Sequence, residues 1–145
     1  MSLLSTCEFQ VLRSAQGEDA FFACMGRFFA SPTVRRECGG YPLNDGPLFH
    51  WFVARQRSDN GVLGFISVEQ TRAGVRIREG YVRPKARGQG LFRELRQRVL
   101  AHADALRVEC RACVPEACVP FLVPCGFRVL SRRGRWVTLV RTAHE

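Results

Sequence analysis

The stretch from residue 75 to residue 103 changes its hydrophobic period halfway, and this change constrains the fold more than any other feature. Up to residue 82, apolar and polar side chains alternate, as in a β-strand. From Leu91 onward the apolar residues recur every four positions, as on one side of a helix. They are Leu91, Leu95, Val99 and Ala103. Gly88 and Gly90 stand between the two patterns. The order of strand, glycine turn and helix predicts a domain that mixes strands and helices.

The rest of the chain supplies further strands and helices. Alternating patterns and turn residues predict strands at 7–14, 51–55, 62–70, 75–82, 106–112, 127–130 and 136–141. Helices are predicted at 18–30, at 91–104 and, interrupted by two prolines, at 115–125. The helix 18–30 has five apolar side chains on one stripe: Phe21, Phe22, Met25, Phe28 and Phe29. The length fits one mixed α/β domain, 1–145.

The charge balance indicates an anionic partner. The chain carries 22 basic and 13 acidic residues, which gives a net charge of +9. Residues 72–98 hold nine of the basic and two of the acidic residues, so the excess is local. A local positive field fits nucleic acid, an acidic protein or a small molecule with phosphates. Because every basic residue except Lys85 is arginine, even where the chain is nearly neutral, the choice of arginine indicates a compositional bias.

Composition excludes several classes of protein. A chain with 46% hydrophobic and 24% charged residues is typical of globular proteins and not of disordered ones. No apolar run approaches the roughly 18 residues of a membrane span, and no signal peptide is visible, so we expect a cytoplasmic protein with no membrane partner. The odd number of cysteines, seven, then indicates reduced thiols. The pair Cys110-x-x-Cys113 lacks the second tight pair of a zinc site, so we expect no metal.

The segment 82–91 has the features of a phosphate-binding loop. Glycines at 88 and 90 let the backbone turn and approach a ligand closely. The N–H groups at a helix start lack partners within the helix and the helix dipole adds positive potential, so a phosphate suits this position. The loop lacks the Gly-Lys-Ser/Thr ending of a nucleotide P-loop. It also lacks the third glycine of a dinucleotide loop, where Arg93 stands. A plain strand-to-helix turn is the alternative interpretation.

Three motifs resemble the GNAT superfamily of N-acetyltransferases. The first is similar to the family's acyl-CoA loop, with Lys85 at its Gln/Arg position, and reads Val82-x-Pro84-x-x-Arg87-Gly88-x-Gly90-Leu91. The second resembles the family's hairpin and reads Asp59-Asn60-Gly61-Val62-Leu63-Gly64. The third resembles the Gly-Phe that opens its sixth strand and reads Cys125-Gly126-Phe127-Arg128. The resemblance, which the order of elements extends over nearly the whole chain, implies an α/β (α+β) fold. Its mixed, splayed sheet would have six to seven strands flanked by three to four helices.

The resemblance also implies a cofactor, acetyl-CoA, between the fourth and fifth strands. Main-chain N–H groups of residues 87–92 would hold the pyrophosphate. Main-chain groups near the end of the fourth strand would hold the pantetheine and the thioester. The expected cofactor-binding residues are Tyr81, Val82, Arg83, Arg87, Gly88, Gln89, Gly90, Leu91 and Phe92. Phe92 departs from the family, which often has a small residue at this position, and it is expected to reshape the pocket.

The usual catalytic acid of the family has no counterpart here. Many members carry a tyrosine four residues before the glycine of Gly-Phe, where it protonates the departing thiolate, and this chain has Leu122 there. The asparagine that usually precedes that tyrosine by seven residues is replaced by Pro115. Water, another residue or unassisted departure of the thiolate would take the place of the acid.

Glu79 is the first candidate for the general base and His50 is the second. Regular alternation would place four side chains on one face: Val75, Ile77, Glu79 and Tyr81. The resemblance implies an alternative, because the family's fourth strand usually carries a bulge that would break this alternation. Apolar surroundings would raise the pKa of the Glu79 carboxyl, which suits removal of a proton from an ammonium group. A structural ion pair with an arginine is the alternative role for Glu79. His50 stands at the start of a strand, where a core or surface role is the alternative.

The resulting hypothesis is an acetyl-CoA-dependent N-acetyltransferase that transfers the acetyl group directly to an amine, either a small molecule or a protein amino group. The loop 38–47, with Tyr41, Asn44 and Asp45, is where the family's acceptor often lies. Dimers are common in the family, which leaves a homodimer open. Two alternatives remain. One is a basic nucleic-acid-binding module, whose affinity would fall steeply with salt. The other is a catalytically silent coenzyme A-binding protein of the same fold.

Overall fold

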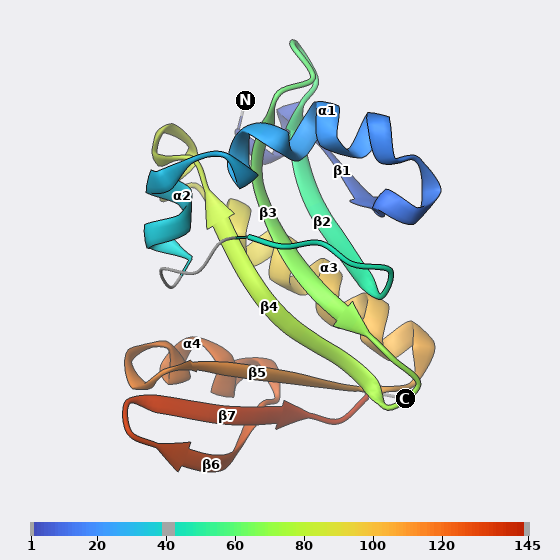
Figure 1. The fold of residues 1–145 in the computed structure, drawn as a ribbon. Coiled ribbons are helices and arrows are strands. Elements are labelled where there is room, and N and C mark those ends of the chain that lie inside the picture. Colours follow the sequence, from blue (N-terminus) through green and yellow to red (C-terminus); the bar gives the residue numbers. More distant parts are fainter. Residues whose placement is uncertain (1, 39–42, 144–145) are drawn as a thin grey trace.

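The computed structural model describes residues 2–38 and 43–143. Within them, seven strands form one open sheet in the order β1-β2-β3-β4-β5-β7-β6. The strands are β1 (Cys7–Leu12), β2 (Phe49–Gln56), β3 (Val62–Gln70), β4 (Gly74–Val82), β5 (Glu109–Pro115), β6 (Arg128–Arg133) and β7 (Trp136–Arg141). The helices are α1 (Glu18–Phe29), α2 (Pro32–Glu37), α3 (Leu91–Leu106) and α4 (Val119–Leu122). Figure 1 shows α1 and α2 in front of the sheet and α3 behind it.

Strands β4 and β5 pair in parallel over a short part of their length. The register runs from Gly74 opposite Glu109 to Arg76 opposite Arg111, and β4 then continues alone to Val82. The other neighbouring strands in the described chain are antiparallel. The two strands therefore diverge, as Figure 1 shows. This confirms the predicted mixed, splayed sheet.

Two apolar clusters hold the helices to opposite faces of the sheet. The cluster under α3 contains Val75, Val82, Leu91, Leu95, Val99 and Leu139 among other buried residues. The cluster under α1 is largely aromatic and contains Phe21, Met25, Phe28, Trp51, Phe65 and Tyr81. Phe22, predicted on the buried stripe of α1, is 38% exposed. It lies outside that stripe because Phe21, Met25 and Phe28, spaced four and three residues apart, define the face toward the sheet.

Helices α2 and α3 and strand β5 differ from the sequence predictions. Ser31, which the sequence marked only as a break, is the N-cap of α2. Its Oγ accepts a hydrogen bond from the Val34 N–H at 3.3 Å, and the proline that follows suits the first turn of a helix. Strand β5 begins at Glu109, later than predicted. Helix α3 continues to Leu106, and Arg107 ends it with a left-handed φ of 58°.

A β-bulge in β4 overturns the predicted alternation. The register with β3 shifts just after Ser67, which pairs with Glu79, so that Arg78 is the extra residue. Ile77 consequently packs against the α3 cluster, whereas Tyr81 packs in the aromatic cluster on the other face. The prediction that four side chains of β4 share one face is therefore wrong: Val75, Ile77, Glu79 and Tyr81.

Candidate functional site

The start of α3 is shaped by two glycines. Gly88 and Gly90 have φ of +76° and +84°, in the left-handed region that favours glycine. No side chain caps the helix at Gly90. The first N–H groups of α3 therefore have no acceptor within the helix, and the helix dipole adds positive potential beside them. This arrangement suits an anion such as a phosphate.

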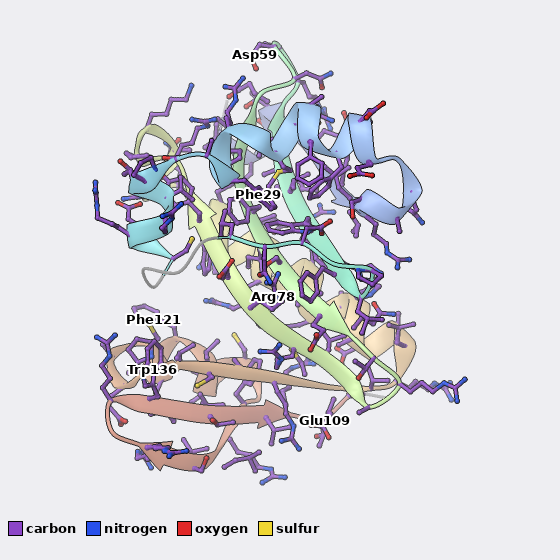
Figure 2. All side chains as sticks on the ribbon, viewed as in Figure 1. Phe29, Asp59, Arg78, Glu109, Phe121 and Trp136 are labelled. Atoms are coloured by element: carbon purple, nitrogen blue, oxygen red, sulfur yellow. The ribbon has the colours of Figure 1, made fainter. Side chains whose placement is uncertain are left out.

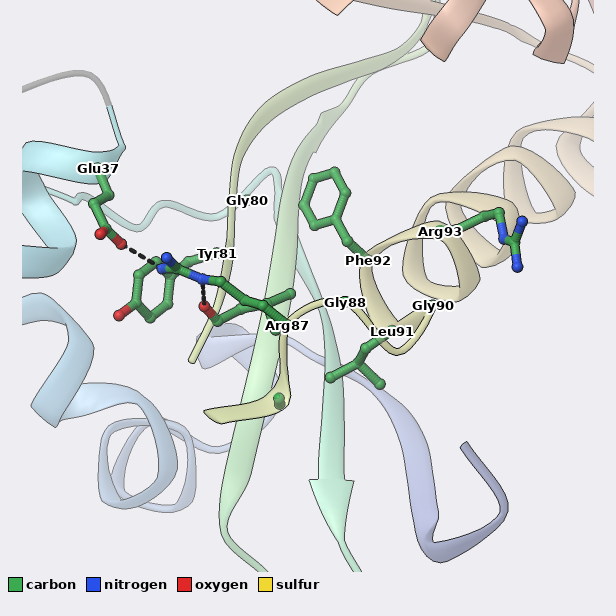
Figure 3. Close-up of a pocket in the computed structure, with 11 residues that line it drawn as sticks. Glu37, Gly80, Tyr81, Arg87, Gly88, Gly90, Leu91, Phe92 and Arg93 are labelled. Atoms are coloured by element: carbon green, nitrogen blue, oxygen red, sulfur yellow. Dashed lines mark hydrogen bonds and ion pairs between the residues drawn. The ribbon is translucent and has the colours of Figure 1, made fainter. Parts of the chain in front are cut away.

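A cavity of about 450 Å³ opens beside this helix start (Figure 3). It is lined by the end of β4, the turn after it, the first turn of α3 and one residue of α2. The lining residues are Glu37, Gly80, Tyr81, Val82, Ala86, Arg87, Gly88, Gly90, Leu91, Phe92 and Arg93. The cavity thus brings together most of the residues that the sequence assigned to the cofactor.

Arg83 and Gln89 are the two assigned residues that do not line this cavity. The Arg83 Nε donates to the Val62 carbonyl at 2.8 Å, and its guanidinium lies 4.7 Å from the centre of the Phe28 ring. The Gln89 Nε2 donates to the Lys85 carbonyl at 3.4 Å on the surface. Both side chains are engaged elsewhere. Arg83 and Gln89 would therefore contact a ligand in this cavity through their main-chain groups.

Arg87 is held in place by three contacts at the edge of the cavity. Its Nη2 lies 2.6 Å from a carboxylate oxygen of Glu37, and its Nε donates to the Val82 carbonyl at 2.8 Å. Its guanidinium also lies 5.3 Å from the centre of the Tyr81 ring. Figure 3 shows this bridge from the β4 turn to α2. Arg93 also lines the cavity and forms no ion pair in the described part of the chain, so its charge is available to an anionic ligand.

A second, apolar cavity of about 340 Å³ lies where β4 and β5 diverge. Its walls come from β3, β4, β5, α3 and the segment around α4: Ile66, Ile77, Phe92, Arg96, Ala112, Val114, Cys118, Phe121 and Leu122. Phe92 lines both cavities and therefore stands between them. Its ring lies over Gly80, where a Cβ atom would come within 2.5 Å of the Phe92 Cε2. Sequence reasoning identified Phe92 but missed Gly80 and this second cavity.

The wall of the apolar cavity includes Leu122, at the position of the family's usual tyrosine. Leu122 is buried and carries no proton to donate. Tyr81 is the tyrosine in the described part of the chain, and its ring packs in the aromatic cluster beside Phe28 and Phe65. Tyr41 lies outside the described residues.

Glu79 lies at the bulge, on the side of the segment that joins α2 to β2. One of its carboxylate oxygens, Oε2, is buried and has no hydrogen-bond partner in the described structure. Burial raises the pKa of the Glu79 carboxyl, and the neighbouring Arg78 opposes this shift. Burial raises the pKa of the Cys38 thiol to about 11, and the charge of Glu79 is the second cause of this shift. Glu79 lines neither cavity, although the next residue, Gly80, lines the first.

His50 lies apart from Glu79, on the face of the sheet covered by α3. Its ring centre is 5.9 Å from that of His102 on α3. The Nδ1 atom of His50 is buried and has no hydrogen-bond partner among residues 2–38 and 43–143. Burial is the main cause of the lowered pKa of His50. The structure therefore does not bring the two candidate bases together.

The Cys110-x-x-Cys113 pair does not form a metal site in the described residues, and the helices there are too short or too polar to span a membrane. Cys110 is buried and Cys113 exposed, since residues three apart in β5 point to opposite faces, and no group of three potential metal ligands gathers among the described residues. No helix in the part of the chain that the structure describes is long and apolar enough to span a membrane.

Comparison by sequence finds no matching family model and no matching curated protein. Comparison by structure finds full-length similarity to acyltransferases. An acyl-CoA N-acyltransferase from Pseudomonas aeruginosa is 17% identical with a TM-score of 0.74, over 94% of this chain and 99% of the other. The ribosomal-protein-S18-alanine N-acetyltransferase from Escherichia coli is 14% identical with a TM-score of 0.71, over 96% and 95%.

A third similar structure was solved with a ligand. It is the PaiA N-acetyltransferase from Thermoplasma acidophilum in complex with coenzyme A, 14% identical with a TM-score of 0.62 over 94% of this chain and 98% of the other. At such identities the similarity establishes the architecture. The sequence motifs and the structure agree on it, and the chain has the fold of the GNAT N-acetyltransferases.

Proposed function

We propose that this protein is an N-acyltransferase that uses acetyl-CoA and transfers the acetyl group directly to an amine. One observation carries the proposal: the uncapped, glycine-shaped start of α3 opens onto a cavity along β4, and a second, apolar cavity follows in the splay of the sheet. An anion site followed by an apolar cavity matches the two ends of coenzyme A, a pyrophosphate and a pantetheine arm. The similarity to a structure solved with coenzyme A supports the same assignment.

The residues present fit this cofactor. N–H groups near Gly88, Gly90 and Leu91 would hold the pyrophosphate, and the unpaired cation of Arg93 would add attraction. The edge of β4 between Gly80 and Val82 has no neighbouring strand on the β5 side, and main-chain N–H groups there would donate to the carbonyls of the pantetheine. The carbonyls of Gly80 and Val82 already accept from Cys38 Sγ and Arg87 Nε. When bound, acetyl-CoA supplies a thioester whose carbonyl carbon is open to attack.

Glu79 would remove the proton that makes the acceptor amine unreactive. Once the ammonium is deprotonated, the nitrogen lone pair would form the new C–N bond, the C–S bond would break, and the nitrogen would lose its second proton to water. A fixed main-chain N–H beside the thioester oxygen would stabilise the charge that develops there. The electron pair leaves on the thiolate, which is stable enough to depart without an acid because a thiol has a pKa of about 8.5. Leu122 is compatible with this course, in which water protonates the thiolate.

A screen for release of coenzyme A from acetyl-CoA over a panel of amines tests the proposal. The expected result is release with at least one amine, together with the acetylated amine detected by mass. Glu79→Gln should lower kcat/KM by about 100-fold or more, which is the usual contribution of a general base. The matched control is Glu69→Gln, because Glu69 lies on the neighbouring strand in an exposed ion pair with Arg76. Equal loss in both variants would contradict the role of Glu79.

The replacement of the tyrosine acid by Leu122 favours a second candidate, a protein of this fold that binds coenzyme A without catalysis. Such a protein would bind acetyl-CoA but release no coenzyme A with any amine, so the same screen, combined with a binding measurement, separates the two.

A further inference from the structure

The bulge in β4 places a cation and an anion next to each other on the face of the sheet that α1 and α2 cover. Arg78 and Glu79 stand together opposite Ser67 of β3. Both are half-buried and therefore remain accessible to a ligand. Figure 2 shows Arg78 near the middle of this face, and Figure 1 shows the segment that leads into β2 crossing in front of the same region.

Arg78 is held in a fixed position, and no carboxylate among residues 2–38 and 43–143 forms an ion pair with it. Its guanidinium lies 3.6 Å from the centre of the Phe49 ring. Its Nη1 donates to the Ser67 Oγ at 3.2 Å, and its Nη2 donates to the Asn44 carbonyl at 3.3 Å and to the Asn44 side-chain oxygen. These acceptors are neutral.

Arg78 shares the lack of an ion pair with the other half-buried arginines. Six arginines form ion pairs within 4 Å in the described part of the chain, of which five are exposed and Arg141 is buried: Arg76, Arg87, Arg98, Arg111, Arg132 and Arg141. Burial is the main cause of the lowered pKa of Arg78, and the charges of Glu79, Glu69 and Asp45 oppose this shift. Nη1 and Nη2 of Arg78 are engaged with Ser67 and Asn44, whereas its Nε has no acceptor in the described part of the chain and is suited to donate to a carboxylate.

Glu79 offers the complementary charge one residue away. It forms no ion pair with Arg78 or with any other described residue, and its Oε2 has no hydrogen-bond partner there. The following residue, Gly80, lines the cavity assigned to the cofactor. An ammonium group beside Glu79 would therefore lie close to that cavity, with a negative group of the same molecule toward Arg78.

We propose that the acceptor is a small zwitterion, an α-amino acid, whose carboxylate binds Arg78 and whose ammonium group faces Glu79. This inference rests on the proposed N-acyltransferase function and specifies its acceptor. A small zwitterion carries the two opposite charges that Arg78 and Glu79 would each attract. The same two side chains disfavour polycationic amines, because Arg78 would repel a second positive charge.

Matched pairs of acceptors test the proposal. L-phenylalanine is compared with 2-phenylethylamine and L-leucine with 3-methylbutylamine, so that each pair differs only in the carboxylate. Acetyl-CoA is the donor and released coenzyme A is measured. We expect kcat/KM to favour the amino acid by about 10- to 100-fold, the usual size of a hydrogen-bonded charge contact.

Three variants show whether Arg78 causes the preference. Arg78→Gln should bring the ratio of amino acid to amine to within about threefold of one, and Arg78→Lys should retain part of it. Arg76→Gln, on the same strand but exposed and paired with Glu69, should keep the full preference. If Arg78 only held the segment at Asn44, its loss would lower kcat/KM equally for the amino acid and the amine. An unchanged ratio of the two values in Arg78→Gln would therefore overturn the inference.

The outcomes also separate this inference from the function on which it rests. Release of coenzyme A with amines but no preference for the carboxylate refutes the zwitterion and leaves the N-acyltransferase intact. The absence of release with every acceptor refutes both.

Discussion

Phe92 closes the passage between the two cavities, and replacing it with alanine should open that passage. The Phe92 ring lies over Gly80 and contributes to the wall of both cavities. A pantetheine arm that runs from the α3 start into the splay of the sheet must displace this ring. Phe92→Ala removes the obstacle and leaves the glycine-shaped helix start unchanged.

The size of the effect follows from how much of the ring is buried. Phe92 is 42% exposed, so somewhat more than half of its surface is removed from water. Full burial of a phenylalanine contributes about 1.5–3 kcal/mol, which leaves about 1–2 kcal/mol for Phe92. Phe92→Ala should lower the free energy of unfolding by this amount. Because the wild-type protein loses the same contact when the ring is displaced, the variant should bind coenzyme A about 5- to 30-fold more tightly.

Calorimetry with two ligands isolates the passage from the phosphate site. Coenzyme A should bind Phe92→Ala more tightly, whereas adenosine 3′-phosphate 5′-diphosphate, which lacks the pantetheine arm, should bind both proteins equally. Phe121→Ala is the matched control, since Phe121 lines the apolar cavity away from the passage and is 65% exposed. An unchanged or weaker affinity of Phe92→Ala for coenzyme A would refute the reasoning.

Three other substitutions test the structure independently. Gly80→Ala should destabilise the protein because its Cβ would lie 2.5 Å from the Phe92 ring. In the double variant with Phe92→Ala the clash is absent, so Gly80→Ala should cost no further stability there, whereas losses that simply add would locate the clash elsewhere. Asp104→Ala leaves the guanidinium of Arg141, whose side chain is 7% exposed, without its carboxylate, and should lower the free energy of unfolding in urea by about 3 kcal/mol. Burial lowers the pKa of His50, so the unfolded chain binds its proton more tightly than the folded one. The stability from neutral His50 is complete above the unfolded pKa of about 6.5 and declines as the pH falls below it. Between pH 7.5 and 5.5 the wild-type urea midpoint should fall more than that of His50→Gln, and parallel falls would argue against this role.

Local patterns predicted most of the fold because each element carries its own signal. The four-residue repeat from Leu91 places α3, and the run 62–70 gives β3 its observed bounds. Errors arose where packing overrides the local signal. Arg107 adopts a left-handed backbone that is usually left to glycine, and this delays β5. The alternation of side chains does not mark the bulge at Arg78, which follows from the pairing with β3 and was indicated only by the resemblance to the family.

The candidate site was predictable only where it is built from consecutive residues. Gly88 and Gly90 directly mark the turn that shapes the helix start. The apolar cavity draws Ile77, Val114 and Leu122 from three elements that are far apart in the sequence, and no spacing rule connects them. The relation of Arg78 to its neighbours likewise depends on the sheet register, which a single sequence does not contain.

Titration calorimetry with acetyl-CoA shows whether the α3 start binds the cofactor. One molecule should bind per chain, saturably. Gly88→Ala should weaken this binding at least tenfold, because the new Cβ, which meets no protein atom within 4 Å, would meet the phosphate instead. Gly134→Ala is the matched control, since Gly134 has a φ of +60°, equally open surroundings and a place in the turn between β6 and β7, and it should bind as the wild type does. No binding at millimolar acetyl-CoA, or equal loss of affinity in the two variants, would contradict the account.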